Sequence, residues 1–190
     1  MNLVQNVSTF FQCFGNWQVK SVEPNKIKFL HAHVAFAFGE IENAGYDANA
    51  TLSIIANELQ HPTIAQGEVA YYLEDFPNSE CISLNGAFPD IQHVDSRHVA
   101  IEAVRICKQQ GWRHVGVLAH PHHQWRCAML LKKQGLIPYY IDCSSVKYSR
   151  QNNQPWVRGG WRLHRDLDPR NSFIPREFMA RILFLLKGWI

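Results

Sequence analysis

Three histidines and one arginine fall within the short segment HPHHQWR, residues 120–126. The apolar run VGVLA precedes it, and a helical pattern follows. If that helix begins near His122 or His123, then His123 and Arg126 are three positions apart and share one helix face. A helix N-terminus offers free N–H groups and partial positive charge, and arginine can bind a carboxylate or phosphate through two bonds. We therefore predict that this segment receives an anion.

Histidine titrates near neutral pH, so His123 is also a candidate general acid or base. Metal binding is one alternative, because the histidines at 120, 122 and 123 could combine with His93, Asp95 and His98 of HVDSRH. Neither HExxH nor another recognised ligand spacing is present, so we predict no metal site. A surface loop with incidental histidines is the other alternative.

Several common catalytic motifs are absent from the sequence. The chain has no GxSxG nucleophile elbow. Asp95 or Ser96 can cap the helix that follows, so Ser96 is expected to be a helix cap rather than a nucleophile. It also lacks the phosphate-binding GxxxxGK[ST] loop and the dinucleotide-binding GxGxxG fingerprint. These absences disfavour nucleotide hydrolysis and nicotinamide-dependent redox chemistry.

The elements that must position these residues alternate between apolar strand patterns and amphipathic helix patterns. Strands are expected within 31–40, 79–86, 113–120 and 137–143, and helices within 47–60, 67–77, 95–111 and 122–135. Asp47 or Asn49 can cap the first of these helices, and Gly111 can end the third. The alternation predicts an α/β fold: a three-layer sandwich in which helices cover both faces of a mostly parallel sheet.

In doubly wound sheets, ligands bind beyond the carboxyl ends of the strands. The first predicted strand ends at a glycine, the second at an Asn-Gly turn and the third at the histidine cluster, and glycine allows the backbone to approach a ligand closely. The start of the helix after the second strand lies at the same edge. The residues predicted to line the site are Gly39, Glu40, Asn85, Gly86, Asp95, Ser96 and His120.

The length of 190 residues suits a single domain. We expect an N-terminal extension over 1–30, an irregular lid or rim over 144–172 and a C-terminal helix over 175–190. Pro175 suits the first turn of that helix. Its inward face is predicted to consist of Phe178, Ile182, Leu185 and Leu186.

Charge and cysteine usage restrict the expected partners and location. The net charge of +3 is too small to indicate nucleic acid by itself, and the arginine- and tryptophan-containing segment 150–165 has no RNA-recognition motif, so no nucleic acid is expected. The five cysteines are scattered without a CxxC spacing, which is typical of reduced thiols. No signal peptide and no membrane span is apparent. We predict a cytoplasmic protein, with no statement about oligomeric state.

The segment VGVLAHPHHQWRCAMLLKKQGL resembles the signature of the bacterial YdcF/SanA/ElyC family, a domain of unknown function. In that family a hydrophobic strand runs into a His-x-x-Arg turn, and the following helix closes in Gly-Leu. The match places the histidine on His123, the arginine on Arg126 and the closing pair at Gly135-Leu136. PREFMARILFLLKGWI is similar to an Arg-Glu-x-x-Ala-Arg segment of many members. In DSRHVAIEA, Asp95 and Ser96 fit a further motif, whereas other positions depart from it.

The resemblance, closest to the YdcF-like branch without a membrane anchor, implies a Rossmann-like fold with a ligand cleft at the strand ends. It also implies that S-adenosylmethionine is a possible cofactor. The resulting hypothesis is that the chain binds a small anionic or nucleotide-like ligand, with acid–base catalysis by His123. The alternatives are a non-catalytic ligand-binding or regulatory module, for S-adenosylmethionine or a phosphorylated metabolite, and a metal-dependent hydrolase.

Overall fold

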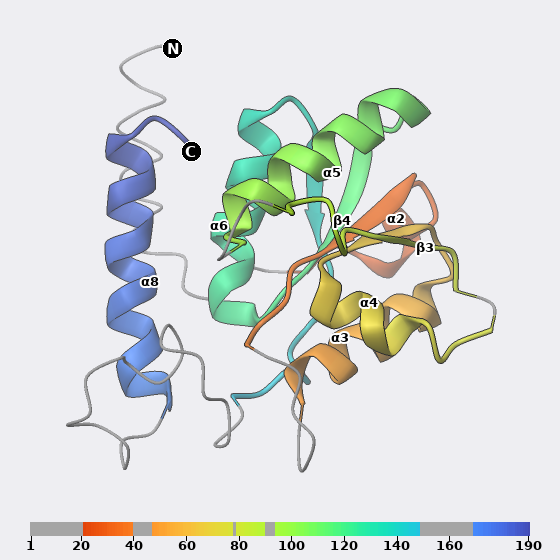
Figure 1. Cartoon of the computed structure of the whole chain (residues 1–190), viewed down its shortest axis with the longest axis horizontal. Helices are drawn as coiled ribbons and strands as arrows, with labels where there is room; N and C mark the ends of the chain where they lie inside the picture. The colour runs from red at the N-terminus through yellow and green to blue at the C-terminus, as the bar shows by residue number, and fades with distance from the viewer. Residues whose placement is uncertain (1–20, 40–46, 78, 90–93, 149–168) are drawn as a thin grey trace.

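The computed structural model describes residues 21–39, 47–77, 79–89, 94–148 and 169–190 (Figure 1). Five strands form one sheet in which every pair is parallel, in the order β3-β2-β1-β4-β5. The strands are β1 (Ala32–Ala35), β2 (Thr63–Ala65), β3 (Cys81–Ser83), β4 (His114–Leu118) and β5 (Ile137–Tyr140). This strand order is that of a Rossmann-like sheet. The chain adds β2 and β3 on one side of β1 and then crosses over to add β4 and β5 on the other side.

Helices cover both faces of the sheet, which confirms the predicted three-layer α/β sandwich (Figure 1). One face carries α3 (Ala48–Leu59) and α4 (Gly67–Leu73), and the other carries α5 (Ser96–Gln110) and α6 (Pro121–Lys133). The short α2 (Pro24–Ile27) precedes β1. The long C-terminal α8 (Pro169–Leu186) lies beside α6.

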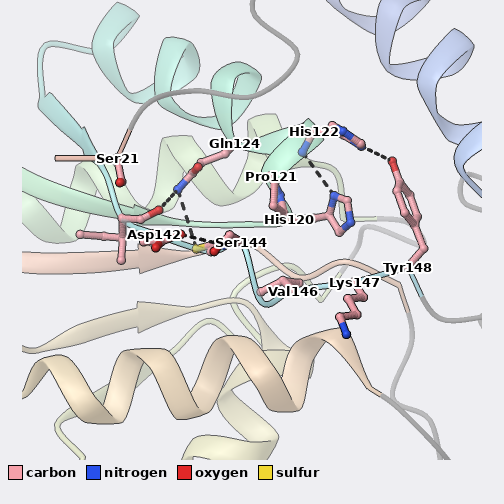
Figure 2. Close-up of a pocket in the computed structure, with 12 residues that line it drawn as sticks. Ser21, His120, Pro121, His122, Gln124, Asp142, Ser144, Val146, Lys147 and Tyr148 are labelled. Carbon is pink, nitrogen blue, oxygen red and sulfur yellow. Dashed lines mark hydrogen bonds between the residues drawn. The ribbon is translucent and has the colours of Figure 1, made fainter.

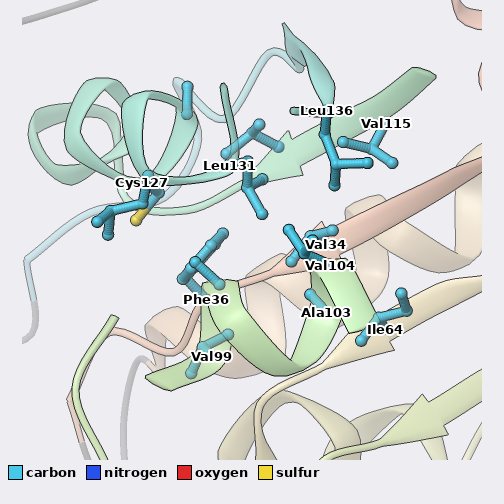
Figure 3. Packing of buried hydrophobic residues seen from close by; sticks show 14 of the residues in the cluster. Val34, Phe36, Ile64, Val99, Ala103, Val104, Val115, Cys127, Leu131 and Leu136 are labelled. Atoms are coloured by element: carbon cyan, nitrogen blue, oxygen red, sulfur yellow. The ribbon is translucent and has the colours of Figure 1, made fainter. Parts of the chain in front are cut away.

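The strands of the sheet centre form because both of their faces are buried. All four residues of β1 are buried, and they alternate between the two cores: Val34 packs with α5 and α6, whereas Ala35 packs with α3 and α4. Figure 3 shows the first of these cores, in which Val34, Val104 and Leu131 meet. Continuous apolar runs of this kind are typical of parallel strands covered on both sides.

The predicted helix ends at Asp47 and Gly111 are confirmed. The Asp47 side chain accepts hydrogen bonds from the amides of Asn49 and Ala50 at the start of α3. Gly111 ends α5 with a φ of 70°, a left-handed conformation that glycine adopts without strain.

One strand was not predicted. β2 has only three residues, and the sequence HPTIAQG around it offers no apolar run long enough to show a period. Its three residues are nevertheless all buried, because β2 is an interior strand with β1 on one side and β3 on the other.

The C-terminal helix differs from its prediction in two ways. It begins at Pro169 instead of near Pro175, which lies inside the helix, where it removes one intrahelical hydrogen bond. Its inward face is also different: Leu186 is 79% exposed, while Glu177 and Arg181 are among the most buried residues of the chain. The expected N-terminal extension is described only from Ser21 onward, and most of the expected lid, 149–168, lies outside the described residues.

Within the described ranges, no helix is both long enough and apolar enough to cross a membrane.

The middle of the sheet contains a histidine that only a glycine neighbour permits. His33 of β1 is paired in register with Gly116 of β4 and is completely buried. A Cβ atom at Gly116 would clash with the His33 Nδ1 atom, and it would lie 2.8 Å from His33 Cε1 and 3.0 Å from Ile141 Cγ1. The imidazole therefore occupies the volume that a side chain at residue 116 would need.

Gly116→Ala should accordingly lower the free energy of unfolding by about 1–3 kcal/mol, as overpacking of a core does. In a His33→Ala background the added methyl group has room, so the cost of Gly116→Ala should largely disappear. Urea denaturation of the four proteins in this double-mutant cycle measures the coupling. Equal costs in both backgrounds would show that His33 is not the residue that excludes the side chain.

Candidate functional site

The helix α6 begins directly after β4, and its N-cap is a histidine. His120 Nδ1 accepts a hydrogen bond from the His122 amide at 3.3 Å. The helices α3 and α5, which start at the same edge of the sheet, are instead capped by the carboxylates of Asp47 and Asp95. Because α6 has no acidic residue in its first turn, its own residues leave the partial positive charge of its N-terminus in place.

A pocket of about 380 Å³ lies beside this first turn (Figure 2). One wall is the start of α6, and the other is the segment that follows β5, residues 141–148. The pocket is thus at the carboxyl ends of β4 and β5, the edge at which Rossmann-like sheets bind ligands. Its polar lining includes Ser21, His120, His122, Asp142, Ser144 and Lys147.

Aromatic rings fix the histidines of this wall. The ring of His120 is stacked on Phe38, with ring centroids 4.0 Å apart, and Tyr148 lies on it at 4.2 Å. The Tyr148 hydroxyl is 2.7 Å from Nδ1 of His122. His120 is only 2% exposed, so its ring is a rigid part of the pocket wall.

Two polar residues shape the opposite part of the pocket. Gln124 donates hydrogen bonds from Nε2 to the carbonyls of Val117 and Ile141, both at 2.8 Å, and so ties the ends of β4 and β5 together. Asp142 accepts a bond from the Ser144 amide at 2.9 Å, which holds the pKa of its carboxyl below the usual range. The acid of the pocket is therefore engaged with its own loop.

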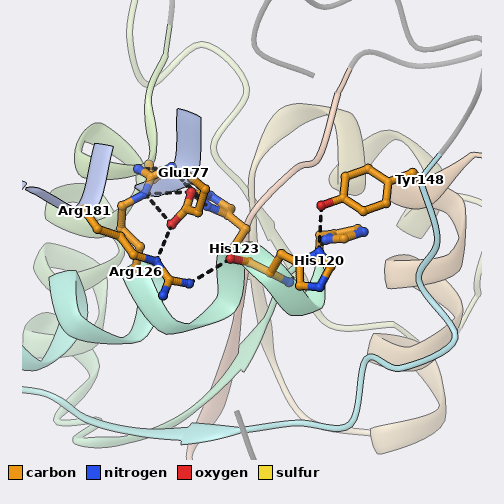
Figure 4. Close-up of polar contacts among 8 residues, drawn as sticks. His120, His123, Arg126, Tyr148, Glu177 and Arg181 are labelled. Carbon is orange, nitrogen blue, oxygen red and sulfur yellow. Dashed lines mark hydrogen bonds and ion pairs between the residues drawn. The ribbon is translucent and has the colours of Figure 1, made fainter. Parts of the chain in front are cut away.

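His123 and Arg126 do share one face of α6, but that face is turned toward α8 (Figure 4). Arg126 Nε lies 3.1 Å from both carboxylate oxygens of Glu177, and Arg126 Nη2 lies 3.0 Å from Oε2. His123 Nδ1 is 3.2 Å from the same Oε2. The anion that Arg126 holds in this structure is thus a side chain of the protein.

A second arginine completes this buried charge cluster. Arg181 donates from Nε to Glu177 Oε1 at 3.1 Å and from Nη2 to the His122 carbonyl at 3.0 Å. The side chains of Glu177 and Arg181 are completely buried. The guanidinium of Arg181 also lies 4.8 Å from the ring centroid of Trp125. The cluster therefore attaches α8 to α6.

The electrostatics of the cluster follow from burial and from the excess of positive charge. Burial alone would raise the pKa of the Glu177 carboxyl, but Arg126 and His123 hold it at about 2. Burial, together with the nearby Arg126, lowers the pKa of His123. The cluster at neutral pH therefore contains ionised Glu177, two arginine cations and a neutral imidazole.

Ser96 is the first residue of α5, and its side chain contacts this cluster, whose other members lie on α6 and α8. Its Oγ lies 3.0 Å from His123 Nε2 and 3.4 Å from Arg126 Nη1. Ser96 does not cap the helix, because the N-cap is Asp95, which accepts from the amides of Arg97 and His98. Of the two candidate caps of this helix, Asp95 is therefore the one that is confirmed.

The loop after β1 is closed by the chain's own side chains. Asn49 accepts from the Phe38 amide at 2.8 Å and donates to the carbonyl of Gly39, whose φ is 93°. Gln66, which follows β2, accepts from the Ala37 amide at 3.1 Å. Glu40 lies outside the described residues.

This closure bears on the S-adenosylmethionine that the family resemblance implies. Rossmann-like cofactor sites use free backbone groups after the first strand and a carboxylate after the second. Here those backbone groups are hydrogen-bonded to the side chains of Asn49 and Gln66, and the Asp47 carboxylate accepts from the first amides of α3. The residue after β2 is Gln66, whose side chain is an amide and not a carboxylate. The described residues do not fit that cofactor at this position.

The remaining predicted residues lie elsewhere along the edge. Asn85 and Gly86 follow β3, the outermost strand, and β2 and β1 separate them from β4. Three strand spacings amount to about 14 Å. Asn85 instead packs against the backbone of Gly67 at the start of α4. The structure thus groups Ser96, His123 and Arg126, places His120 in the neighbouring pocket, and leaves Asn85 and Gly86 apart from both.

Sequence reasoning did not assign a role to Glu177, Arg181, Tyr148 or Lys147. The pair Glu177–Arg181 had a signal, since both belong to the Arg-Glu-x-x-Ala-Arg segment and are spaced to share a helix face. Tyr148 and Lys147 had none, because they lie in a loop whose position depends on the sheet.

Within the described ranges, no group of three or more His, Cys, Asp or Glu side chains is arranged to hold a metal ion. Comparison of the chain with protein-family models, curated proteins and solved structures gave no match. The class that the fold defines is a Rossmann-like α/β domain, and the resemblance to the YdcF-like family stays a prediction.

Proposed function

We propose that the chain binds a small anionic metabolite or nucleotide-like ligand in the pocket at the N-terminus of α6. The observation that carries this proposal is the position of the pocket: it opens beside a helix N-terminus without an acidic first turn, at the carboxyl edge of a parallel sheet. A cytoplasmic location, expected from the sequence, is part of the same proposal.

Charge and hydrogen-bonding groups in the pocket support an anion. Lys147 brings a cation, and Ser21 brings a hydroxyl group that can donate to oxygen atoms. His122 adds an imidazole next to the helix start. The rings of His120 and Tyr148 pack on each other in the pocket wall and hold these polar groups in a rigid frame.

Lys147→Ala should weaken the binding of an anion by about tenfold or more, because a charge-assisted contact is lost. The probes are inorganic phosphate and adenosine monophosphate, and the measurement is isothermal titration calorimetry at low salt. Lys108→Ala is the matched control: it removes the same charge from the exposed last turn of α5, at the opposite edge of the sheet.

Absence of binding by both probes, or equal weakening in both variants, would contradict the anion pocket. Binding of S-adenosylmethionine instead of either probe, detected in the same titration, would favour the alternative of a regulatory module for that cofactor.

A further inference from the structure

The side chains of Ser96, His123 and Glu177, from the helices α5, α6 and α8, form a chain of polar contacts at the start of α5. Ser96 Oγ is 3.0 Å from His123 Nε2. His123 Nδ1 is 3.2 Å from Oε2 of Glu177, and both of these side chains are labelled in Figure 4. We infer that Ser96 is a nucleophile, with His123 as its general base and Glu177 as the carboxylate that orients the base, and that it hydrolyses a small carboxylic ester. A hydroxyl, an imidazole and a carboxylate at hydrogen-bond distances in this order are the parts of a serine triad.

The proposed roles assign one tautomer to His123. The triad requires the tautomer in which His123 Nδ1 carries the hydrogen and donates it to Glu177, because an ionised carboxylate only accepts hydrogen bonds. Nε2 is then the accepting nitrogen, and the Ser96 hydroxyl donates to it. Arg126 Nη2 lies 3.0 Å from His123 Nδ1, and in this tautomer both nitrogens donate to Glu177 Oε2.

Burial increases from Ser96 through His123 to Glu177, as it does from nucleophile to carboxylate in a serine triad. The Glu177 side chain is completely buried and that of His123 is 7% exposed, whereas Ser96 is half-buried. The serine is therefore the member closest to solvent and to a substrate. The lowered pKa of His123 keeps the imidazole neutral at pH 7, as a base must be.

Arg126 supplies positive charge where a tetrahedral intermediate would need it. Its Nη1 lies 3.4 Å from Ser96 Oγ, while its other nitrogens bind Glu177. An oxyanion formed on the carbon attached to Oγ would lie within reach of this guanidinium. Charge fixed in advance at that place lowers the barrier, because it needs no reorganisation during the reaction.

The reaction balances without a cofactor. Ser96 Oγ attacks the ester carbonyl carbon while its proton passes to His123 Nε2. The carbon–oxygen bond to the leaving alcohol then breaks, and the alcohol takes that proton. In the second half, water gives a proton to His123 Nε2 and its oxygen attacks the acyl carbon, after which the bond to Oγ breaks and Ser96 regains the proton. The products are a carboxylic acid and an alcohol.

The test is covalent labelling by a fluorophosphonate, which reacts with activated serines, followed by peptide mass spectrometry and by p-nitrophenyl acetate hydrolysis. The wild-type protein should be labelled on Ser96. Ser96→Ala should abolish the label and lower ester hydrolysis at least about 100-fold, because the nucleophile itself is lost. His123→Gln, verified as folded by its thermal unfolding, should reduce labelling of Ser96 by a similar factor.

Ser83→Ala is the matched control, because Ser83 is an exposed serine at the end of β3 and should be neither labelled nor required. Failure of Ser96 to react in the folded wild-type protein would overturn the proposal, and so would unchanged hydrolysis in Ser96→Ala. The proposal retains the acid–base role predicted for His123 and does not rest on the anion pocket. Phosphate binding by Ser96→Ala therefore tests the pocket separately.

Discussion

Replacing Glu177 by glutamine should lower the free energy of unfolding by about 3–5 kcal/mol. The side chain of Glu177 is completely buried, and it is the shared anionic partner of Arg126 and Arg181. Glutamine keeps the shape but removes the charge, so two guanidinium groups with at most 11% exposure would lose the anion that they share. Removing one partner of a buried ion pair is costly because the remaining charge stays out of water.

Urea denaturation followed by far-ultraviolet circular dichroism measures this change. Glu102→Gln is the matched control, since Glu102 also holds an arginine through paired hydrogen bonds, to Arg105, but on the exposed side of α5. Exposed pairs contribute little because water and salt screen them, so the control should remain near wild type. Similar losses in the two variants would mean that burial of the Glu177 cluster does not determine its contribution.

A third variant separates charge from packing at the same site. Replacing Glu177 by leucine and both Arg126 and Arg181 by methionine removes all three charges while preserving most of the volume. Apolar substitutions of buried ion clusters are often neutral or stabilising, so this variant should recover most of the stability lost in Glu177→Gln. Ser96 of this variant should still not react with the fluorophosphonate, because His123 loses the carboxylate that orients it.

The sheet and its helices could be predicted because their signals are local. Helix caps such as Asp47 and Gly111 depend on one side chain or one backbone angle, and the buried strands are visible as apolar runs. β2 escaped prediction because three residues are too few to reveal a period, and the sheet, not the segment, determines that they form a strand.

The inward face of α8 escaped prediction for a different reason. The pattern of apolar residues was taken as the buried face, which would have included Leu186, yet the most buried side chains are Glu177 and Arg181. Charged residues are almost never fully buried unless they are paired. Their pairing depends on Arg126, 51 positions away from Glu177. A partner at that separation cannot be recognised from sequence spacing.

The same separation explains what happened to the candidate site. The sequence indicated that His123 and Arg126 share a helix face and that Arg126 binds an anion, and both features are present in the structure. It could not indicate that the anion is Glu177 or that Ser96 approaches His123 from α5. The sequence placed the candidate site at the end of β4, where the pocket lies, but Lys147 and Tyr148 line that pocket only through the fold of the loop after β5.

Acid should destabilise the protein well above the pH at which its carboxylates titrate, and His33 should be a main cause. Burial, with a smaller contribution from His61, lowers the pKa of His33 from 6.5 to about 3. Neither ring nitrogen of His33 has a hydrogen-bond partner in the described part of the chain. The folded protein therefore keeps this imidazole neutral, whereas the unfolded chain binds a proton below pH 6.5.

The direction of this pH dependence follows from the number of protons that each state binds. Between pH 6.5 and about 3 the unfolded state carries one more proton at His33 than the folded state, so the free energy of unfolding falls as the pH falls. Each pH unit within this window corresponds to about 1.4 kcal/mol. From pH 6.5 to 4.5, His33 alone should cost about 2–3 kcal/mol. Glu177, with a pKa of about 2 in place of 4.5, adds an acid loss only below pH 4.5.

The variant His33→Leu isolates this contribution. Leucine fills a similar volume above Gly116, in a place without hydrogen-bond partners among the described residues, so the variant should be at least as stable as wild type at pH 7.5. His123, whose pKa is also lowered, acts with the same sign in both proteins, so it remains in the variant and cancels in the difference. Urea denaturation at pH 7.5, 6.5, 5.5 and 4.5 should therefore show wild type losing about 2–3 kcal/mol more than His33→Leu across the lower three values. Parallel pH dependences would mean that His33 takes up its proton in the folded protein as readily as in the unfolded chain, and the acid sensitivity would then have to come from His123.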